Sequence, residues 1–132
     1  MRALLLPLLA STMCLVGPSA SQNAGPSRAW IKVFERSLDL DALIKNDPAH
    51  DRPVRHEDFA RYYILERVGG EVRVWGRYLP PQDAWRDNPA LPKGTHIGEP
   101  PLPVLDGGCS VVTLLIVHES FEVVRAFCNG RA

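Results

Sequence analysis

The chain has 132 residues, of which 45% are apolar and 23% charged, and its formal net charge is zero. This length fits one folded domain, and the composition is that of an ordinary globular protein. A neutral balance argues against a nucleic-acid binder, which normally has a basic excess, and gives no support to electrostatic attachment to an anionic membrane.

The first twenty residues have the pattern of a secretory signal. Arg2 provides a positive start, residues 3–16 form an apolar run, and small side chains surround Ala20. The run is shorter than the ~20 apolar residues that a membrane-spanning helix needs. We therefore expect residues 1–20 to be a signal peptide, cleaved between positions 19 and 24, and the protein to be periplasmic or secreted.

The three cysteines fall into two groups. Cys14 lies in the expected signal, where an alternative is a lipid anchor, although Ser11 and Met13 do not match the residues that such a signal prefers. Removal of the signal leaves Cys109 and Cys128, and an exported chain with two cysteines allows one intramolecular pairing. We predict this disulfide, with two free buried thiols as the alternative.

A helix is predicted after a flexible lead-in over residues 21–26. Ser27 is a suitable N-cap, and the apolar residues behind it recur at the spacing of one buried helical face. This apolar pattern continues to Ile44, with a small adjustment near Ser37, and the helix should end at Asp47, because the residue before a proline avoids the α region.

Residues 59–68 and 71–79 are the clearest predicted hairpin, because Gly69 and Gly70 supply the positive φ angles of a two-residue turn. One face of this hairpin is apolar and should contact the helix. The other face is mixed and should be half exposed. It holds Tyr62, Ile64, Glu66, Arg73, Trp75 and Arg77.

A long Pro-rich loop is predicted over residues 79–108, with a short helical turn near residues 82–87 and a brief edge strand at Val104 and Leu105. Loops of this length are uncommon in a compact domain and are often functional.

Residues 109–117 and 121–128 form the second predicted hairpin. The first of these strands is apolar on both faces, which is typical of the middle of a sheet. A turn at His118 and Glu119 places Cys109 opposite Cys128 or nearly so. The predicted disulfide would therefore join the open end of this hairpin.

The predicted fold is a single α+β domain over residues 27–132. One N-terminal helix packs on a four-stranded antiparallel meander sheet, made of two hairpins that the long loop joins. In outline this arrangement resembles cystatin-type or cone-shaped α+β folds. The resemblance concerns architecture only, and such folds serve unrelated functions.

Candidate catalytic residues are few. His96 shares the long loop with Asp83, Asp87 and Glu99, and a general acid–base role needs these groups within hydrogen-bond reach of one another. No serine lies in a Gly-x-Ser-x-Gly elbow, and the two mature cysteines are assigned to the disulfide, so no nucleophile is apparent.

A second polar segment contains His50 and His56 beside Asp51, Glu57 and Asp58. Imidazole and carboxylate groups can share a divalent metal ion. Their spacing matches no familiar ligand motif, so we expect a solvated connection, and we expect no metal or other cofactor.

Aromatic side chains next to arginines are the better candidates for binding. Trp85 and Arg86 lie in a polar part of the long loop, and such side chains are enriched as interface anchors. Trp85 either serves that purpose or folds back to fasten the loop to the sheet. A second candidate surface, formed by Tyr62, Arg73, Trp75 and Arg77, either stacks on a ligand or is a cross-strand ladder.

The leading hypothesis is an exported binding or inhibitory module that uses the rigid long loop, with an envelope protein or a glycan as its partner. One alternative is a small hydrolase or metal-dependent enzyme centred on His96. Another is an accessory envelope protein that assembles with copies of itself. The oligomeric state cannot be read from the residues.

Overall fold

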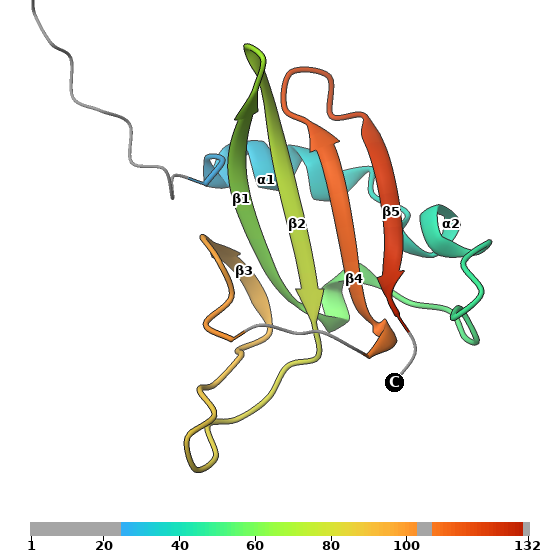
Figure 1. The fold of residues 1–132 in the computed structure, drawn as a ribbon, viewed down its shortest axis with the longest axis vertical. Helices are drawn as coiled ribbons and strands as arrows, with labels where there is room; N and C mark the ends of the chain where they lie inside the picture. Colours follow the sequence, from blue (N-terminus) through green and yellow to red (C-terminus); the bar gives the residue numbers. More distant parts are fainter. Residues whose placement is uncertain (1–24, 103–106, 131–132) are drawn as a thin grey trace, which may run out of the picture.

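The structure is a computed structural model that describes residues 25–102 and 107–130. The expected signal peptide, its cleavage region and the brief strand at Val104 and Leu105 lie outside the described residues. The fold is mixed α+β, with one five-stranded sheet in the order β3-β1-β2-β4-β5 and two short helices covering one of its faces (Figure 1). Among the described helices, none is long and apolar enough to cross a membrane.

Two helices, α1 (Arg28–Arg36) and α2 (Leu40–Ile44), replace the single predicted helix. Each has its own N-cap. The hydroxyl of Ser27 accepts a 3.1 Å hydrogen bond from the backbone N–H of Trp30, and a carboxylate oxygen of Asp39 accepts one of 3.0 Å from that of Ala42. Asp39 therefore begins a new helix where the apolar pattern alone predicted continuation, because a short acidic side chain competes for the backbone.

Strands β1 (Ala60–Val68) and β2 (Glu71–Leu79) form the first predicted hairpin in the predicted register, with Ile64 opposite Trp75. Gly69 and Gly70 have the positive φ angles that the turn requires, 57° and 85°. The helix-facing side of the hairpin packs against α1 and α2, as its apolar pattern indicated.

The second hairpin consists of β4 (Gly108–Val117) and β5 (Val123–Asn129). Strand β4 lies between β2 and β5, and its residues 111–116 are buried. The predicted bridge between Cys109 and Cys128 is present, with the two Cα atoms 4.6 Å apart. The backbone N–H of Cys128 donates to a carboxylate oxygen of Asp47 at 2.9 Å, which ties the segment after α2 to this strand.

The predicted four-stranded antiparallel sheet is wrong in one respect, because a fifth strand, β3 (Gly94–Ile97), pairs with β1 in parallel. The chain leaves β2, crosses to the outer side of β1 and adds this strand at the edge of the sheet. Ala60 consequently pairs with Leu79 of β2 on one side and with Gly94 of β3 on the other. Four residues that include a glycine and a histidine give no periodic apolar signal, so the pattern did not reveal the strand.

The main core lies between the sheet and the helices. Tyr63 and Tyr78 are fully buried there, and Gly76 makes room for them: a Cβ atom at this position would lie 3.3 Å from the ring of Tyr78 and 3.4 Å from that of Tyr63. A smaller apolar cluster occupies part of the opposite face. Its buried members are Ala60, Tyr62, Leu79 and Leu91.

Candidate functional site

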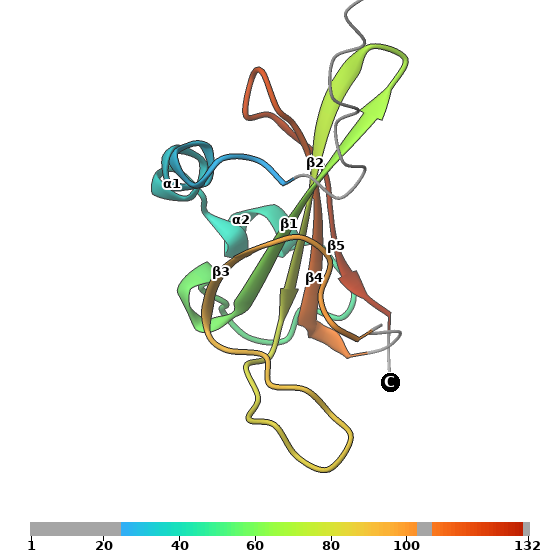
Figure 2. The same cartoon turned by 90° about the vertical axis from the view of Figure 1, so that its left-hand side faces the viewer.

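Residues 80–93 connect β2 to β3 along the chain and form a narrow arm that projects beyond the end of the sheet (Figures 1 and 2). Its two sides are joined by backbone hydrogen bonds. Gln82 and Leu91 exchange two, of 3.0 and 2.8 Å, and Trp85 and Asn88 exchange two of 3.0 Å nearer the tip. The helical turn predicted over residues 82–87 is therefore wrong, because this part of the chain is paired like a small hairpin.

Trp85 and Arg86 form the tip of the arm. The Trp85 side chain is 64% exposed, and the guanidinium carbon of Arg86 lies 4.3 Å from the centre of its ring. Arg86 has a φ angle of 53°, a conformation that non-glycine residues adopt at some energetic cost. Of the two interpretations of Trp85, the one in which it packs on the sheet is wrong.

Leu91 anchors the arm instead of Trp85. Its side chain is only 2% exposed and packs with Ala60, Tyr62 and Leu79 on the face of the sheet opposite the helices. At the return to the sheet, the amine of Lys93 lies 3.7 Å from a carboxylate oxygen of Asp58. The arm thus has a buried apolar attachment at its base and a solvent-exposed aromatic tip.

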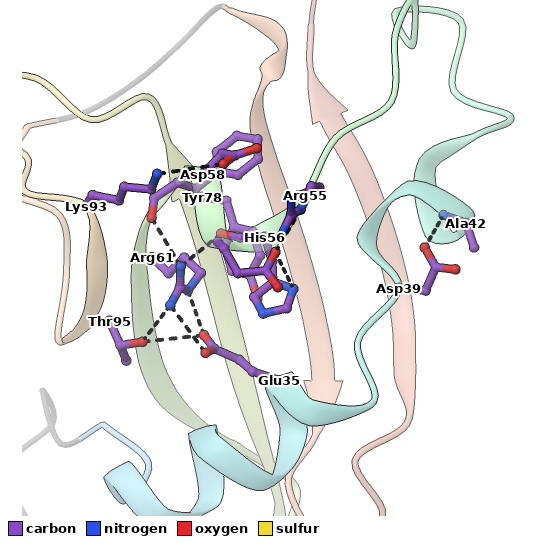
Figure 3. A network of polar contacts seen from close by, with 12 residues as sticks. Glu35, Asp39, Ala42, Arg55, His56, Asp58, Arg61, Tyr78, Lys93 and Thr95 are labelled. Atoms are coloured by element: carbon purple, nitrogen blue, oxygen red, sulfur yellow. Dashed lines mark hydrogen bonds and ion pairs between the residues drawn. The ribbon is translucent and has the colours of Figure 1, made fainter.

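A buried polar network holds β3, and with it one end of the arm, against β1 and α1 (Figure 3). The guanidinium of Arg61 donates to Glu35 at 2.7 Å and to the hydroxyl of Thr95 at 3.1 Å. It also donates to the carbonyl oxygens of His56 and Phe59, at 2.9 and 3.4 Å, next to the short 3-10 turn His56–Asp58. One side chain therefore connects four segments of the chain.

Two buried tyrosines complete this network. The hydroxyl of Tyr63 donates to Glu35 at 2.8 Å and lies 2.6 Å from the hydroxyl of Tyr78, which is then the donor of that pair. Burial raises the pKa of Tyr78, and burial together with the neighbouring Tyr78 and Glu35 raises the pKa of Tyr63 well above its usual range.

Among the described residues, every buried side-chain nitrogen and oxygen atom has a hydrogen-bond partner. The network is therefore a satisfied structural contact, and it offers no unpaired group for acid–base chemistry. Sequence reasoning missed it. The available signal was the position of Arg61, which falls between Phe59 and Tyr63 on the helix-facing side of the predicted strand.

The candidate surface around Trp75 is largely occupied by its own contacts. The indole N–H of Trp75 donates to Glu66 at 2.6 Å, and the guanidinium carbon of Arg77 lies 5.9 Å from the centre of the indole ring. Arg73 donates to Glu71 at 2.7 Å. The contact between Trp75 and Glu66 joins β2 to β1, whereas the other two lie within β2, so the polar groups of this face are engaged with their own neighbours.

The same face contains two of the other candidate residues. Tyr62 is 6% exposed, and the ring of His96 stacks on it with the ring centres 4.7 Å apart. The tyrosine is thus covered, and it does not join Trp75 and Arg77 in an open binding surface.

The candidate catalytic residues are not brought together. The Nε2 atom of His96 donates to the carbonyl oxygen of Pro92 at 2.6 Å, and within residues 25–102 and 107–130 it forms no ion pair with a carboxylate. Glu99 lies 3.9 Å from Arg77, whereas Asp83 and Asp87 belong to the arm. An acid–base set centred on His96 is not assembled.

In the described part of the chain, the candidate metal ligands do not come together as a cluster of three. Nε2 of His50 lies 2.8 Å from a carboxylate oxygen of Asp41, and this hydrogen bond is the main cause of the lowered pKa of Asp41. Nδ1 of His56 lies 3.6 Å from Glu57. In the described part of the chain, the one cluster of three potential ligands combines Asp47 with the two disulfide sulfurs, which have no thiolate to offer a metal.

Comparison with protein-family models, with curated proteins and with solved structures finds no match for this chain. The resemblance to cystatin-type or cone-shaped folds stays an analogy of outline.

Proposed function

We propose that this protein is an exported binding module that captures its partner through the tip of the arm. The observation that supports this most directly is Trp85, whose large apolar side chain is 64% exposed and stacked against Arg86. Tryptophan and arginine are the residue types that contribute most often to the strongest contacts in interfaces.

The arm is suited to binding because its conformation is already restricted. Backbone pairing closes it at Gln82 and Leu91 and again at Trp85 and Asn88. Four prolines lie in the same segment, at positions 80, 81, 89 and 92. A loop that is ordered before binding loses less conformational entropy on association, so more of its contact energy appears as affinity.

The polar neighbours of Trp85 suit a partner with both apolar and hydrogen-bonding groups. Asp83, Asp87 and Asn88 are exposed on the same arm as Arg86. An envelope protein or a glycan has this mixture of groups, since an indole ring stacks on the apolar side of a sugar as well as on a protein side chain.

Export is part of the proposal. The disulfide between Cys109 and Cys128 fits an oxidising compartment such as the periplasm or the medium. The signal peptide proposed for residues 1–20, and the less favoured lipid anchor at Cys14, concern residues that the structure does not describe.

The two alternative functions receive no specific support from the geometry. An enzyme centred on His96 needs acidic groups beside the imidazole, and that ring is bonded to a backbone carbonyl and stacked on Tyr62. Assembly of identical copies would need a self-complementary surface on the two protomers.

The experiment that tests the proposal is affinity capture from envelope extracts with the oxidised mature domain. Three versions are compared: the unchanged chain, Trp85→Ala, and Val124→Ala as the control, because Val124 is a 43% exposed apolar residue on β5. We expect a partner that the unchanged chain and the control retain and that Trp85→Ala loses. Retention of the same partner by Trp85→Ala, with its urea unfolding curve unchanged, would contradict the role given to the arm.

A further inference from the structure

A cleft of about 520 Å³ lies between the turns of the two hairpins. The turn that joins β4 and β5 leans toward α1, whereas the turn of the β1–β2 hairpin leans away from it (Figure 2). The backbone N–H of His118 donates to the carbonyl oxygen of Val72 at 3.0 Å and so links the two sides below the opening. This volume is in the range of small-molecule sites.

Aromatic rings form one wall of the cleft. The ring of Trp30 stacks with that of His118 at 5.2 Å between centres and with that of Phe121 at 5.1 Å, and all three residues line the cleft. The indole N–H of Trp30 donates to the carbonyl oxygen of His118 at 2.8 Å, which holds the turn against α1. The wall therefore has a defined arrangement.

The backbone of this turn is held in an uncommon conformation. Phe121 has a φ angle of 60°, although it is neither glycine nor asparagine. Hydrogen bonds on both sides hold it there: its N–H donates to Val117 at 2.9 Å, and the N–H of Val117 donates to Glu122 at 2.8 Å. Such conformations concentrate at ligand-binding sites, where the surrounding structure maintains them.

The charged side chains that line the cleft are both acidic. Glu71 comes from the β1–β2 side and Glu119 from the β4–β5 turn. Arg73 neutralises Glu71 in part, at 2.7 Å, whereas Glu119 is exposed and forms no ion pair with any described residue. Neither lysine nor arginine is among the lining residues. Aromatic rings beside carboxylates attract organic cations, because both the ring faces and the carboxylates favour positive charge.

We propose that this cleft binds a small organic cation with an alkylated ammonium group. The site is independent of the arm, so it adds a second ligand class to a protein whose proposed partner binds at Trp85. The ammonium group lies between Glu119 and the half-buried rings of His118 and Phe121, and its alkyl groups contact these two rings. Trp30 is buried behind them and holds them in place by stacking.

The test is a titration of the oxidised domain with choline, followed by the backbone amide signals of the cleft residues in NMR spectra. A second titration uses the neutral analogue in which a tert-butyl group replaces the trimethylammonium group. We expect choline, and not the neutral analogue, to shift the signals of Gly70, Val72, Glu119 and Phe121.

Matched variants separate the proposed site from a general attraction to acidic surface. Glu119→Gln removes one carboxylate of the cleft, and Glu122→Gln removes an exposed carboxylate nearby that does not line it. We expect the Kd for choline to rise about five- to tenfold in Glu119→Gln, as for the loss of one favourable ionic contact, and to stay unchanged in Glu122→Gln.

Three results would overturn the proposal. One is equal binding of choline and the neutral analogue. The second is an unchanged Kd in Glu119→Gln. The third is the absence of any shift up to about 100 mM choline, a concentration that would saturate even a millimolar site. Because Glu119 is exposed on a turn, its substitution leaves the fold intact, and the spectrum of the free variant verifies this directly.

Discussion

The carboxylate of Glu35 on α1 accepts a 2.7 Å hydrogen bond from Nε of Arg61 on β1, although 26 residues separate the two in the chain. Both side chains are largely buried, with 15% and 10% of their surface exposed. The pair lies where the helix crosses the sheet. The guanidinium of Arg61 also donates a hydrogen bond to the hydroxyl of Thr95 on β3. Arg61 therefore holds both α1 and β3, the strand that follows the arm, against β1.

Removal of Arg61 should destabilise the protein strongly. Arg61→Ala leaves the carboxylate of Glu35 buried without its cation, and broken buried pairs of this kind cost about 3–5 kcal/mol. Urea unfolding measures the change. Lys93→Ala is the control, since its pair with Asp58 is exposed and contributes at most about 1 kcal/mol. Equal losses of stability in the two variants would contradict the importance assigned to the buried pair.

The three tyrosines should resist ionisation in the folded protein. Burial raises the pKa of Tyr62, Tyr63 and Tyr78, so the folded chain keeps them neutral at a pH where the unfolded chain, with values near about 10, loses their protons. Their contribution to stability is therefore complete below about pH 10 and is lost as the pH rises above it.

Tyrosinate absorbance, recorded against pH for the native protein and for the chain in urea, checks this directly. We expect the native curve to be displaced to higher pH and to end in alkaline unfolding. Tyr63→Phe is a useful second sample, because it removes one buried hydroxyl and leaves Tyr78 in place. Native absorbance that rises with the same midpoint as in urea would show that the hydroxyls are accessible.

Loss of the disulfide should lower the stability without changing the strand order. Cys109 and Cys128 are 19 residues apart, and closure of a loop of that size contributes roughly 3 kcal/mol in the chain-entropy model. The double variant Cys109→Ser, Cys128→Ser and the reduced parent should unfold at similarly lower urea concentrations. A parent protein that unfolds at the same urea concentration with and without reductant would contradict the bridge.

Truncation of Leu91 should lower the free energy of unfolding strongly, whereas truncation of Trp85 should leave it nearly unchanged. Leu91→Ala empties a buried position at the base of the arm, and such changes cost about 2–5 kcal/mol in a core. Trp85→Ala affects an exposed tip and should alter the free energy of unfolding by no more than about 0.5 kcal/mol. Urea unfolding with limited proteolysis of the arm distinguishes them: only Leu91→Ala should expose the arm to cleavage.

Local signals explain what was predicted correctly. Two adjacent glycines between two strands of alternating polarity indicate a two-residue turn. The turn at Gly69 and Gly70 determines every residue pair of the β1–β2 register. The disulfide followed from an even cysteine count and an exported context. The turn is encoded in a few neighbouring residues, whereas the disulfide was predicted from the number of cysteines that remain after an expected signal peptide.

The features that were missed depend on contacts across long stretches of chain. The hydrogen bond from Arg61 to the hydroxyl of Thr95 helps to hold β3 in place. The two residues are 34 positions apart, and no local sequence pattern indicates such a contact. In the arm it is Leu91, and not Trp85, that packs on the sheet. In neither case does residue type alone decide the outcome.

Ala60 pairs with Leu79, the residue before the arm, on one side and with Gly94, the residue after it, on the other. Both ends of the arm are therefore next to the same residue of β1. The two attachment points are therefore about 10 Å apart, twice the spacing between adjacent strands. Because the entropy cost of closing a loop grows only slowly with its length, the gap accepts loops of many lengths. The spacing of the strands therefore does not fix the length of this connection, whereas the buried side chain of Leu91 does tie the present arm to the sheet. A segment grafted between the two points would keep the stability of the scaffold only if it supplied an apolar side chain at the position of Leu91.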